Sequence, residues 1–441
     1  MVVIWGIKVV STENKAPEQG ELIGDFGLTP IQKMFFESKY ANANYVNQSV
    51  ILEVNSKLTK PFLNAIFSVI VKYHDIFRAT FNEKFQTYTS KSFVDISSKT
   101  IHDYQEIELD ANLIQASLDI HKGPLCKVVL YEYPGNKSKL LIVAHHLIID
   151  GVSWRILIDD INSIYRSFIS SGSVSLPPKS FSYRQWESAL QASVSKFSSE
   201  VDYWNNIQRK IESCSFNLPQ PIGNDCSAKH LKIRLDEETT SRLIRNIPEE
   251  LNVHINSVLL TALVLAVGNV TGEYKLGFAL EGHGREDIIG LDVSRTIGWF
   301  TSIFPVFLEL DCPQDLKQSI IDANKILESI PNKGIGFSVL SRYTNEIDTS
   351  IPKISFNYLG QWNSAKAGVE PFSYSDCSSG SDVDPNNEQL SSLDINCEVK
   401  LNQFVADFSY KQNCFKEDFI KDVAMNFENI LIQIVQLCHC A

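Results

Sequence analysis

The segment Lys139-Leu-Leu-Ile-Val-Ala-His-His-Leu-Ile-Ile-Asp-Gly-Val-Ser-Trp154 decides how this chain folds. Its apolar run, residues 140–144, predicts a buried strand. Two histidines end that strand, Asp150 and Gly151 break it, and apolar spacing over residues 154–168 predicts a helix. Because a polar turn between a strand and a helix is accessible yet held by a rigid scaffold, we expect functional side chains here.

The two adjacent histidines, His145 and His146, should point to opposite sides, because side chains alternate along a strand. We expect one to be held inside by hydrogen bonds and the other to face a cleft as a base. Two ordinary histidines at the edge of the core are the alternative. A zinc site is a third possibility, although no cysteine or further histidine stands at ligand spacing nearby.

Length and composition set the broad class. The chain has 441 residues, of which 44% are hydrophobic, enough for two domains or one two-lobed unit. A net charge of -12 without a basic stripe argues against a nucleic-acid partner. The nine cysteines lack a short-spaced framework, which predicts free thiols, and Cys438 and Cys440 flank His439 too closely for zinc.

No apolar run approaches the ~20 residues of a membrane span. Residues 1–10 are apolar but lack a basic leader and a cleavage site, so they make a poor signal peptide. We therefore expect no membrane partner. The free thiols fit a reducing cytoplasm, and a monomer is expected.

Four segments are predicted along the chain. Residues 1–27 form a linker or N-terminal extension, 28–212 an N-terminal lobe, 213–228 an inter-lobe linker rich in turn residues, and 229–441 a C-terminal lobe. Helices and strands mix in both halves, which predicts an α/β fold of two similar lobes with a cleft between them. Within the second half, residues 363–392 form a long polar loop that we expect to be functional or disordered.

A second motif, Glu281-Gly-His-Gly-Arg-Glu286, follows a predicted strand in the second half. Its glycines let backbone or substrate approach closely. A solvated surface turn is the alternative. Together with the His-His turn, Glu281 supplies a second potential proton-transfer group.

These motifs resemble the signature of the condensation-domain superfamily of nonribosomal peptide synthetases, and its epimerization branch in particular. Met34 stands where that family often has tryptophan. The chain starts at a methionine and contains no adenylation or carrier segment, so we expect an excised domain or a free-standing protein. Besides the two motifs above, the resemblance rests on four stretches in the family's order: Thr29-Pro-Ile-Gln32, Arg295-Thr-Ile-Gly-Trp-Phe-Thr301, Pro331-Asn-Lys-Gly-Ile-Gly-Phe337 and Phe356-Asn-Tyr-Leu-Gly-Gln361.

The resemblance implies two chloramphenicol-acetyltransferase-like lobes arranged as a V-shaped pseudo-dimer with a central tunnel. It implies epimerisation at Cα, from L to D, of an aminoacyl or peptidyl thioester. The thioester would be carried on the 4'-phosphopantetheine arm of a peptidyl carrier protein, with adenylation and downstream condensation domains as neighbours. No metal and no cofactor of the domain's own are implied.

Inversion beside a thioester needs acid/base groups on opposite walls and stabilisation of the enolate oxygen. We expect His146 and Glu281 to be the catalytic pair, and Asp150 to hold the turn by pairing with Arg285. A peptide-bond-forming condensation domain and a non-catalytic recruitment module are the alternatives. The remaining candidates are supporting residues (His145, Asn357 and Tyr358, the last two for polarising the thioester or orienting the substrate) and tunnel residues (Gly151, Ser153, Trp154 and Trp299).

Overall fold

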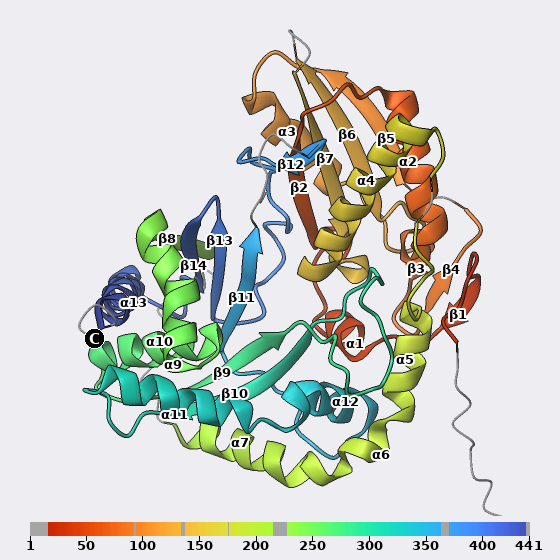
Figure 1. Cartoon of the computed structure of the whole chain (residues 1–441). Helices are drawn as coiled ribbons and strands as arrows, with labels where there is room; N and C mark the ends of the chain where they lie inside the picture. The colour runs from red at the N-terminus through yellow and green to blue at the C-terminus, as the bar shows by residue number, and fades with distance from the viewer. Residues whose placement is uncertain are drawn as a thin grey trace, which may run out of the picture.

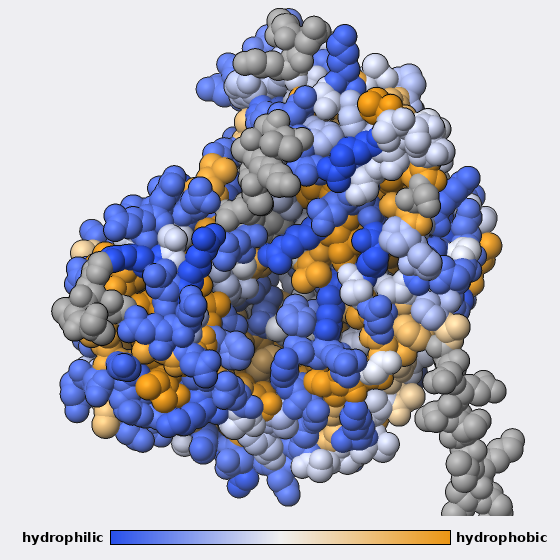
Figure 2. Space-filling view, viewed as in Figure 1, coloured by the Kyte–Doolittle hydropathy of each residue, from blue (hydrophilic) through white to orange (hydrophobic). Residues whose placement is uncertain are grey.

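The structure is a computed structural model that describes residues 16–91, 94–133, 137–174, 176–214, 227–362 and 370–437. Two large sheets lie in separate lobes (Figure 1). The predicted α/β fold of two lobes is therefore confirmed. On the face shown in Figure 2, the surface is hollowed between the lobes.

The first lobe is built on a five-stranded sheet. Helix α3 covers one face of this sheet, where Ile107 and Ala111 pack with Leu141 and Val143, while α2 and α4 cover the other. Because both faces are covered, the central strand is apolar throughout residues 140–144. The strands, in sheet order, are β12 (Phe372–Tyr374), β2 (Asn47–Val54), β7 (Lys137–His145), β6 (Cys126–Tyr133) and β5 (Val94–Thr100), and the helices are α2 (Lys60–Tyr73), α3 (Gln105–Gln115) and α4 (Gly151–Ser171).

Smaller elements complete the first lobe. Helix α1 (Pro30–Glu37) begins with a capping box, in which the Gln32 side chain accepts a hydrogen bond from the Thr29 backbone N–H at 3.0 Å. A three-stranded sheet lies beside it, with β1 (Gly24–Phe26), β4 (Gln86–Tyr88) and β3 (Ala79–Phe81) in that order. Strand β1 thus falls inside residues 1–27, which the sequence assigns to a linker.

The second lobe is built on a six-stranded sheet. Its central helix, α10, is apolar on nearly every side because it packs against α11 and α13 as well as the sheet. In sheet order the strands are β10 (Ser302–Glu309), β9 (Lys275–Gly282), β11 (Ile354–Trp362), β13 (Leu393–Lys400), β14 (Gln403–Lys411) and β8 (Ala228–Arg234), and the helices are α8 (Glu237–Ser241), α9 (Ile247–Leu251), α10 (Ile255–Thr271), α11 (Leu316–Glu328), α12 (Ile335–Tyr343) and α13 (Glu417–Leu437).

The two faces of this second sheet differ. Along β13, Leu393, Ile395 and Cys397 are buried, whereas the alternating residues Asp394 and Asn396 are only partly buried. The buried face packs on the helices. The polar face therefore supplies side chains for the region between the lobes.

The lobes are divided less simply than the sequence suggests. All strands of the six-stranded sheet follow residue 227, but β12, from the second half, pairs with β2 of the first lobe. Three consecutive helices lead to the second lobe: α5 (Tyr183–Ala192), α6 (Val194–Phe197) and α7 (Val201–Ser213). Helix α7 packs directly on strand β9, because a Cβ at Gly277 of β9 would lie 2.7 Å from the Ile211 side chain of α7. Assigning residues up to 212 wholly to the first lobe is therefore wrong for α7. The linker residues 215–226 and loop residues 363–369 lie outside the described part of the chain.

Within the described ranges, no single helix is long and apolar enough to cross a membrane. The pair Glu237–Leu251 and Ile255–Thr271 passes that test only when taken together, and it is bent by 105°.

Candidate active site

His145 ends strand β7 and points into the protein. It is fully buried. Its Nε2–H donates to the Ala43 carbonyl at 2.8 Å, and its Nδ1 accepts from the Leu147 backbone N–H at 3.1 Å. Burial lowers the pKa of His145 to about 3. His145 is thus a neutral residue that holds the turn, as a supporting role requires.

His146 begins a short 3-10 turn, His146–Ile148, and its ring is half-buried. Nδ1–H donates to the Ile149 carbonyl at 2.9 Å, which leaves Nε2 as an acceptor. The Gln48 amide nitrogen lies 3.2 Å from that Nε2, and the Gln48 oxygen accepts from the Trp154 indole N–H at 2.9 Å. Burial lowers the pKa of His146, opposed by the Ile149 hydrogen bond. The turn therefore presents a neutral imidazole with its lone pair on Nε2.

Aromatic rings lie beside His146. Trp299 stacks on the imidazole with ring centroids 4.2 Å apart and an interplanar angle of 26°. Phe35 lies 6.3 Å from Trp299 and 5.2 Å from Tyr40, again between ring centroids. Trp299 is 7% exposed, so it is a buried residue. It also lies directly against His146, the predicted base.

Asp150 is the N-cap of α4 and the centre of an inter-lobe connection. Its carboxylate accepts hydrogen bonds from the backbone N–H groups of Ser153 at 2.7 Å and Phe300 at 3.0 Å. It also pairs with the Arg285 guanidinium at 3.2 Å, as the sequence predicts. A Cβ at Gly284, whose φ is +69°, would lie 1.7 Å from the Phe300 carbonyl. Glycine is therefore required for the Glu281–Glu286 motif to bring Arg285 to Asp150.

Two of the residues predicted to line a tunnel, Ser153 and Trp154, are buried in helix α4. Ser153 is fully buried and its hydroxyl donates to the Gly298 carbonyl at 2.9 Å. Trp154 is 2% exposed and orients Gln48. Both side chains point toward the protein interior, and their role as tunnel residues remains a prediction. Gly151, the first residue of α4, is half-buried and remains a prediction.

Glu281 stands near the end of β9 in the second lobe. The Asn357 amide donates to its Oε2 at 2.8 Å. Burial, and then the negative charge of Asp394, raise the pKa of Glu281 to about 7. Glu281 therefore keeps a proton at a pH where an ordinary glutamate has lost it.

Asn357 and Tyr358 do not act from the same side of β11. Tyr358 is the register partner of the buried Cys397, whereas Asn357 pairs with Asn396 on the polar face. Burial raises the pKa of Tyr358 to about 12. Asn357 therefore joins Glu281, and the substrate role of Tyr358 remains a prediction.

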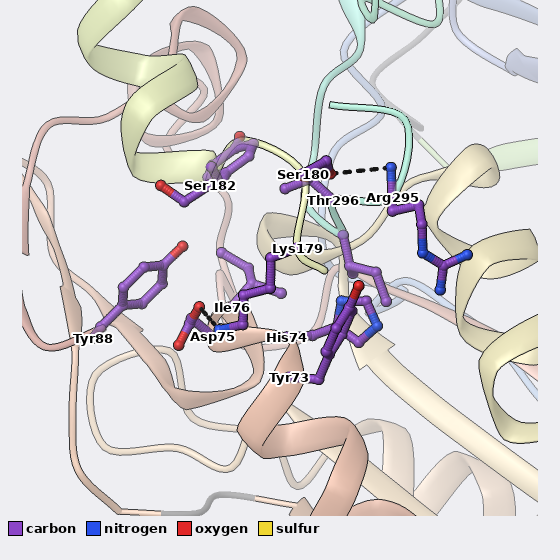
Figure 3. Close-up of a pocket in the computed structure, with 12 residues that line it drawn as sticks. Tyr73, His74, Asp75, Ile76, Tyr88, Lys179, Ser180, Ser182, Arg295 and Thr296 are labelled. Carbon is purple, nitrogen blue, oxygen red and sulfur yellow. Dashed lines mark hydrogen bonds and ion pairs between the residues drawn. The ribbon is translucent and has the colours of Figure 1, made fainter. Parts of the chain in front are cut away.

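Figure 3 shows a small cavity lined by residues that include His74, Asp75, Lys179 and Arg295. On one side of it Asp160 accepts from His74 at 2.8 Å and forms an ion pair with Arg295. On the other side Asp75 pairs with Lys179 at 2.8 Å. These contacts give Arg295 of the Arg295–Thr301 motif a bracing role between α4 and the loop that carries Trp299.

Across the described ranges, no group of three or more His, Cys, Asp or Glu residues is placed to hold a metal ion.

Three residues near His146 and Glu281 were not singled out by sequence patterns: Gln48, Tyr40 and Asp394. The available signals were weak: a polar residue opening the apolar strand β2, and an alternating acidic residue in β13.

Comparison with known proteins identifies the class. The condensation domain family model matches residues 23–441, so the chain belongs to the condensation-domain family. The epimerization domain from the third module of tyrocidine synthetase B is similar, with a TM-score of 0.89 and 30% identity over 96% of this chain and 99% of that chain. The condensation domain from Monacolin K polyketide synthase, at 12% identity and a TM-score of 0.75 over 95% of this chain and 98% of that chain, shows the fold alone.

Curated relatives are much longer proteins. Gramicidin S synthase 1 of Brevibacillus brevis is 30% identical, and the match covers 98% of this chain and 42% of that protein. Tyrocidine synthase 2 of Brevibacillus parabrevis is 32% identical, with 97% and 12% covered. The chain thus spans less than half of either relative.

Proposed function

We propose that this domain epimerises the Cα of an aminoacyl or peptidyl thioester, converting L to D, in nonribosomal peptide synthesis. The observation that carries the proposal is the pairing of opposite protonation states. His146, in the first lobe, has an unprotonated Nε2 that accepts from the Gln48 amide and would exchange this partner for the substrate Cα–H, while Glu281, in the second lobe, retains a proton. The similarity to an epimerization domain at 30% identity supports it.

The chemistry follows from these two states. In one direction His146 Nε2 removes the Cα proton, and the electron pair moves into the thioester carbonyl to form an enolate. The Glu281 carboxyl then delivers its proton to the opposite face of Cα. His146 ends protonated and Glu281 ionised, and in the other direction the two exchange roles. Each proton-transfer group of this kind contributes about 10²- to 10⁴-fold.

The substrate is proposed to arrive on the 4'-phosphopantetheine arm of a peptidyl carrier protein, which supplies the only prosthetic group the reaction uses. Adenylation and downstream condensation domains would be its neighbours, and the cytoplasm its compartment. A tunnel between the lobes would admit the arm. The curated relatives, as synthases of gramicidin S and tyrocidine, favour this setting.

Peptide-bond formation is the second candidate, because His146 and the fold also suit a condensation domain. A carrier protein loaded with an L-aminoacyl group separates the two. After incubation, the thioester is hydrolysed and its chirality measured, with an acceptor-loaded carrier added in a parallel reaction. A mixture of D and L product without peptide supports epimerisation. Peptide without D product contradicts it, and unchanged L-aminoacyl carrier would indicate a recruitment module.

A further inference from the structure

Asp394 shares the polar face of the second sheet with Glu281. In the parallel register, Ser355 of β11 is the partner of both Ala279 on β9 and Asp394 on β13. Side chains two residues apart on a strand lie on the same face. Glu281, Asn357, Ser355 and Asp394 therefore face one space, while Phe356 and Ile395 are buried behind them.

Both carboxyl groups turn toward the strand between them. Asn357 donates to Glu281 at 2.8 Å, and the Ser355 hydroxyl donates to an Asp394 oxygen. Ser355 and Asn357 are two residues apart, or about 7 Å along the strand. Glu281 and Asp394 stand on the strands that flank β11 and both turn toward it, so the charge of Asp394 acts on Glu281.

The surroundings of the two carboxyls are unequal. Burial raises the pKa of Asp394, but hydrogen bonds from Ser355, Ser391 and Gln389 and the charge of Lys411 oppose that shift and favour its ionised form. Among the described residues, the one hydrogen-bond donor recorded for Glu281 is the Asn357 amide. When two carboxyls interact, the better-stabilised one takes the charge and the other keeps the proton.

Other groups around Glu281 do not change this assignment. From the first lobe, Tyr40 faces both carboxyls, but burial raises its pKa to about 12, so it stays neutral. On β10, the register partner of Glu281 is the apolar Ile303. Asp394 is accordingly the charged group that acts on Glu281 from the described elements around it.

We propose that Asp394 is a positioning residue for the reaction: its carboxylate, fixed by Ser355 on the face of Glu281, keeps the Glu281 carboxyl protonated and ready to donate to Cα. The reaction itself rests on the proposed function. Asp394 is given no contact with the substrate and acts only through Glu281.

The test reads the Glu281 proton directly. The domain is labelled with ¹³C at the glutamate carboxyl and titrated by NMR, with the Glu281 signal assigned by its loss in Glu281→Gln. The variant Asp394→Asn keeps the shape of the side chain and can still accept a hydrogen bond from Ser355. In this variant the midpoint of the Glu281 titration should fall by about one pH unit. Glu398→Gln is the matched control: Glu398 is on the same strand and face, two residues beyond Asn396 as Asp394 is two residues before it, but the charge that acts on Glu281 is that of Asp394, so the midpoint should stay unchanged.

Activity supplies a second measurement. The pH profile of kcat for epimerisation should shift in Asp394→Asn with little change in KM. If Asp394→Asn does not fold, Ser355→Ala replaces it, because losing that donor disfavours the Asp394 charge and should lower the midpoint less. An unmoved midpoint, or an equal shift in Glu398→Gln, overturns the proposal. A shifted midpoint in a domain that makes no D product instead removes the proposed reaction and leaves the Asp394–Glu281 coupling standing.

Discussion

His146 and Glu281 lie in regions of different construction. The His146 turn is dense: each ring nitrogen has a partner, Gln48 is oriented by Trp154, and Trp299 covers the ring. Among the described residues, Glu281 has one amide donor and a second carboxyl nearby. The first arrangement fixes one tautomer of a base, and the second leaves an acid in its protonated form. The contrast shows how two ordinary side chains acquire complementary states from their surroundings.

The largest effect is expected from removing either group. His146→Ala and Glu281→Gln should each slow epimerisation by about 10²- to 10⁴-fold while the protein still folds. Chirality of the hydrolysed thioester gives the rate, and circular dichroism checks the fold. The exposed residues His102 and Glu309 provide matched controls, His102→Ala and Glu309→Gln. A near wild-type rate in either site variant would remove that residue from the catalytic pair.

Solvent isotope labelling tests whether His146 and Glu281 act on opposite faces of Cα. In D₂O, wild type should place solvent deuterium mainly in the newly formed enantiomer, because a separate, solvent-exchanged group delivers the second proton. Glu281→Gln should retain some Cα–H exchange on the His146 face without inversion. Mass spectrometry of the separated enantiomers gives the label. Mostly unlabelled inverted product would instead indicate a single shuttling base.

The ion pair between Asp150 and Arg285, which connects the two lobes, should stabilise the protein. Asp150→Ala leaves buried Arg285 without its ion-pair partner, so the free energy of unfolding should fall by about 3–5 kcal/mol. Urea unfolding measures it. Asp236→Ala, which removes the exposed N-cap of α8, should cost only about 1 kcal/mol. Normal stability with lost activity in Asp150→Ala would favour a direct chemical role for Asp150.

Glu281 should lower the free energy of unfolding at high pH, where its carboxyl must ionise in the folded protein. Its folded pKa, about 7, lies above the unfolded value, so the folded state binds the extra proton between these values and stability falls as pH rises through this window. Glu281→Gln should therefore be more stable than wild type at pH 8, by on the order of 2 kcal/mol, and equal near pH 4. Unfolding curves at both pH values measure this difference. Equal stability at pH 8 would mean that Glu281 ionises normally.

The smallest effect is expected at the partner that orients the base. Gln48→Leu removes the hydrogen bond to His146 and leaves the Trp154 N–H unpaired, so stability should fall by about 1 kcal/mol and the rate by roughly tenfold. Gln105→Leu, at an exposed glutamine, is the control. An unchanged rate in Gln48→Leu would show that the Nδ1 bond to Ile149 alone fixes the tautomer.

Local patterns predicted much of the fold and the histidine turn. The strand, turn and helix around His146 and the pairing of Asp150 with Arg285 agree with the structure. The buried positions of Ser153 and Trp154 were not predicted, because a motif gives the order of residues but not how a helix face is turned. The exchange of β12 between lobes was also not predicted, since three residues carry too little periodicity.

By itself, the sequence determined the two-lobed α/β class and the positions of the His146 and Glu281 motifs, because periodicity and turn chemistry act within a few residues. Only the tertiary structure decided that Gln48 meets His146, and that Tyr40 and Asp394 meet Glu281. Those partners lie tens to hundreds of residues apart and are joined by sheet register and lobe packing. The protonation states of the two groups depend on these long-range neighbours, because burial and nearby charge, rather than residue type, set them.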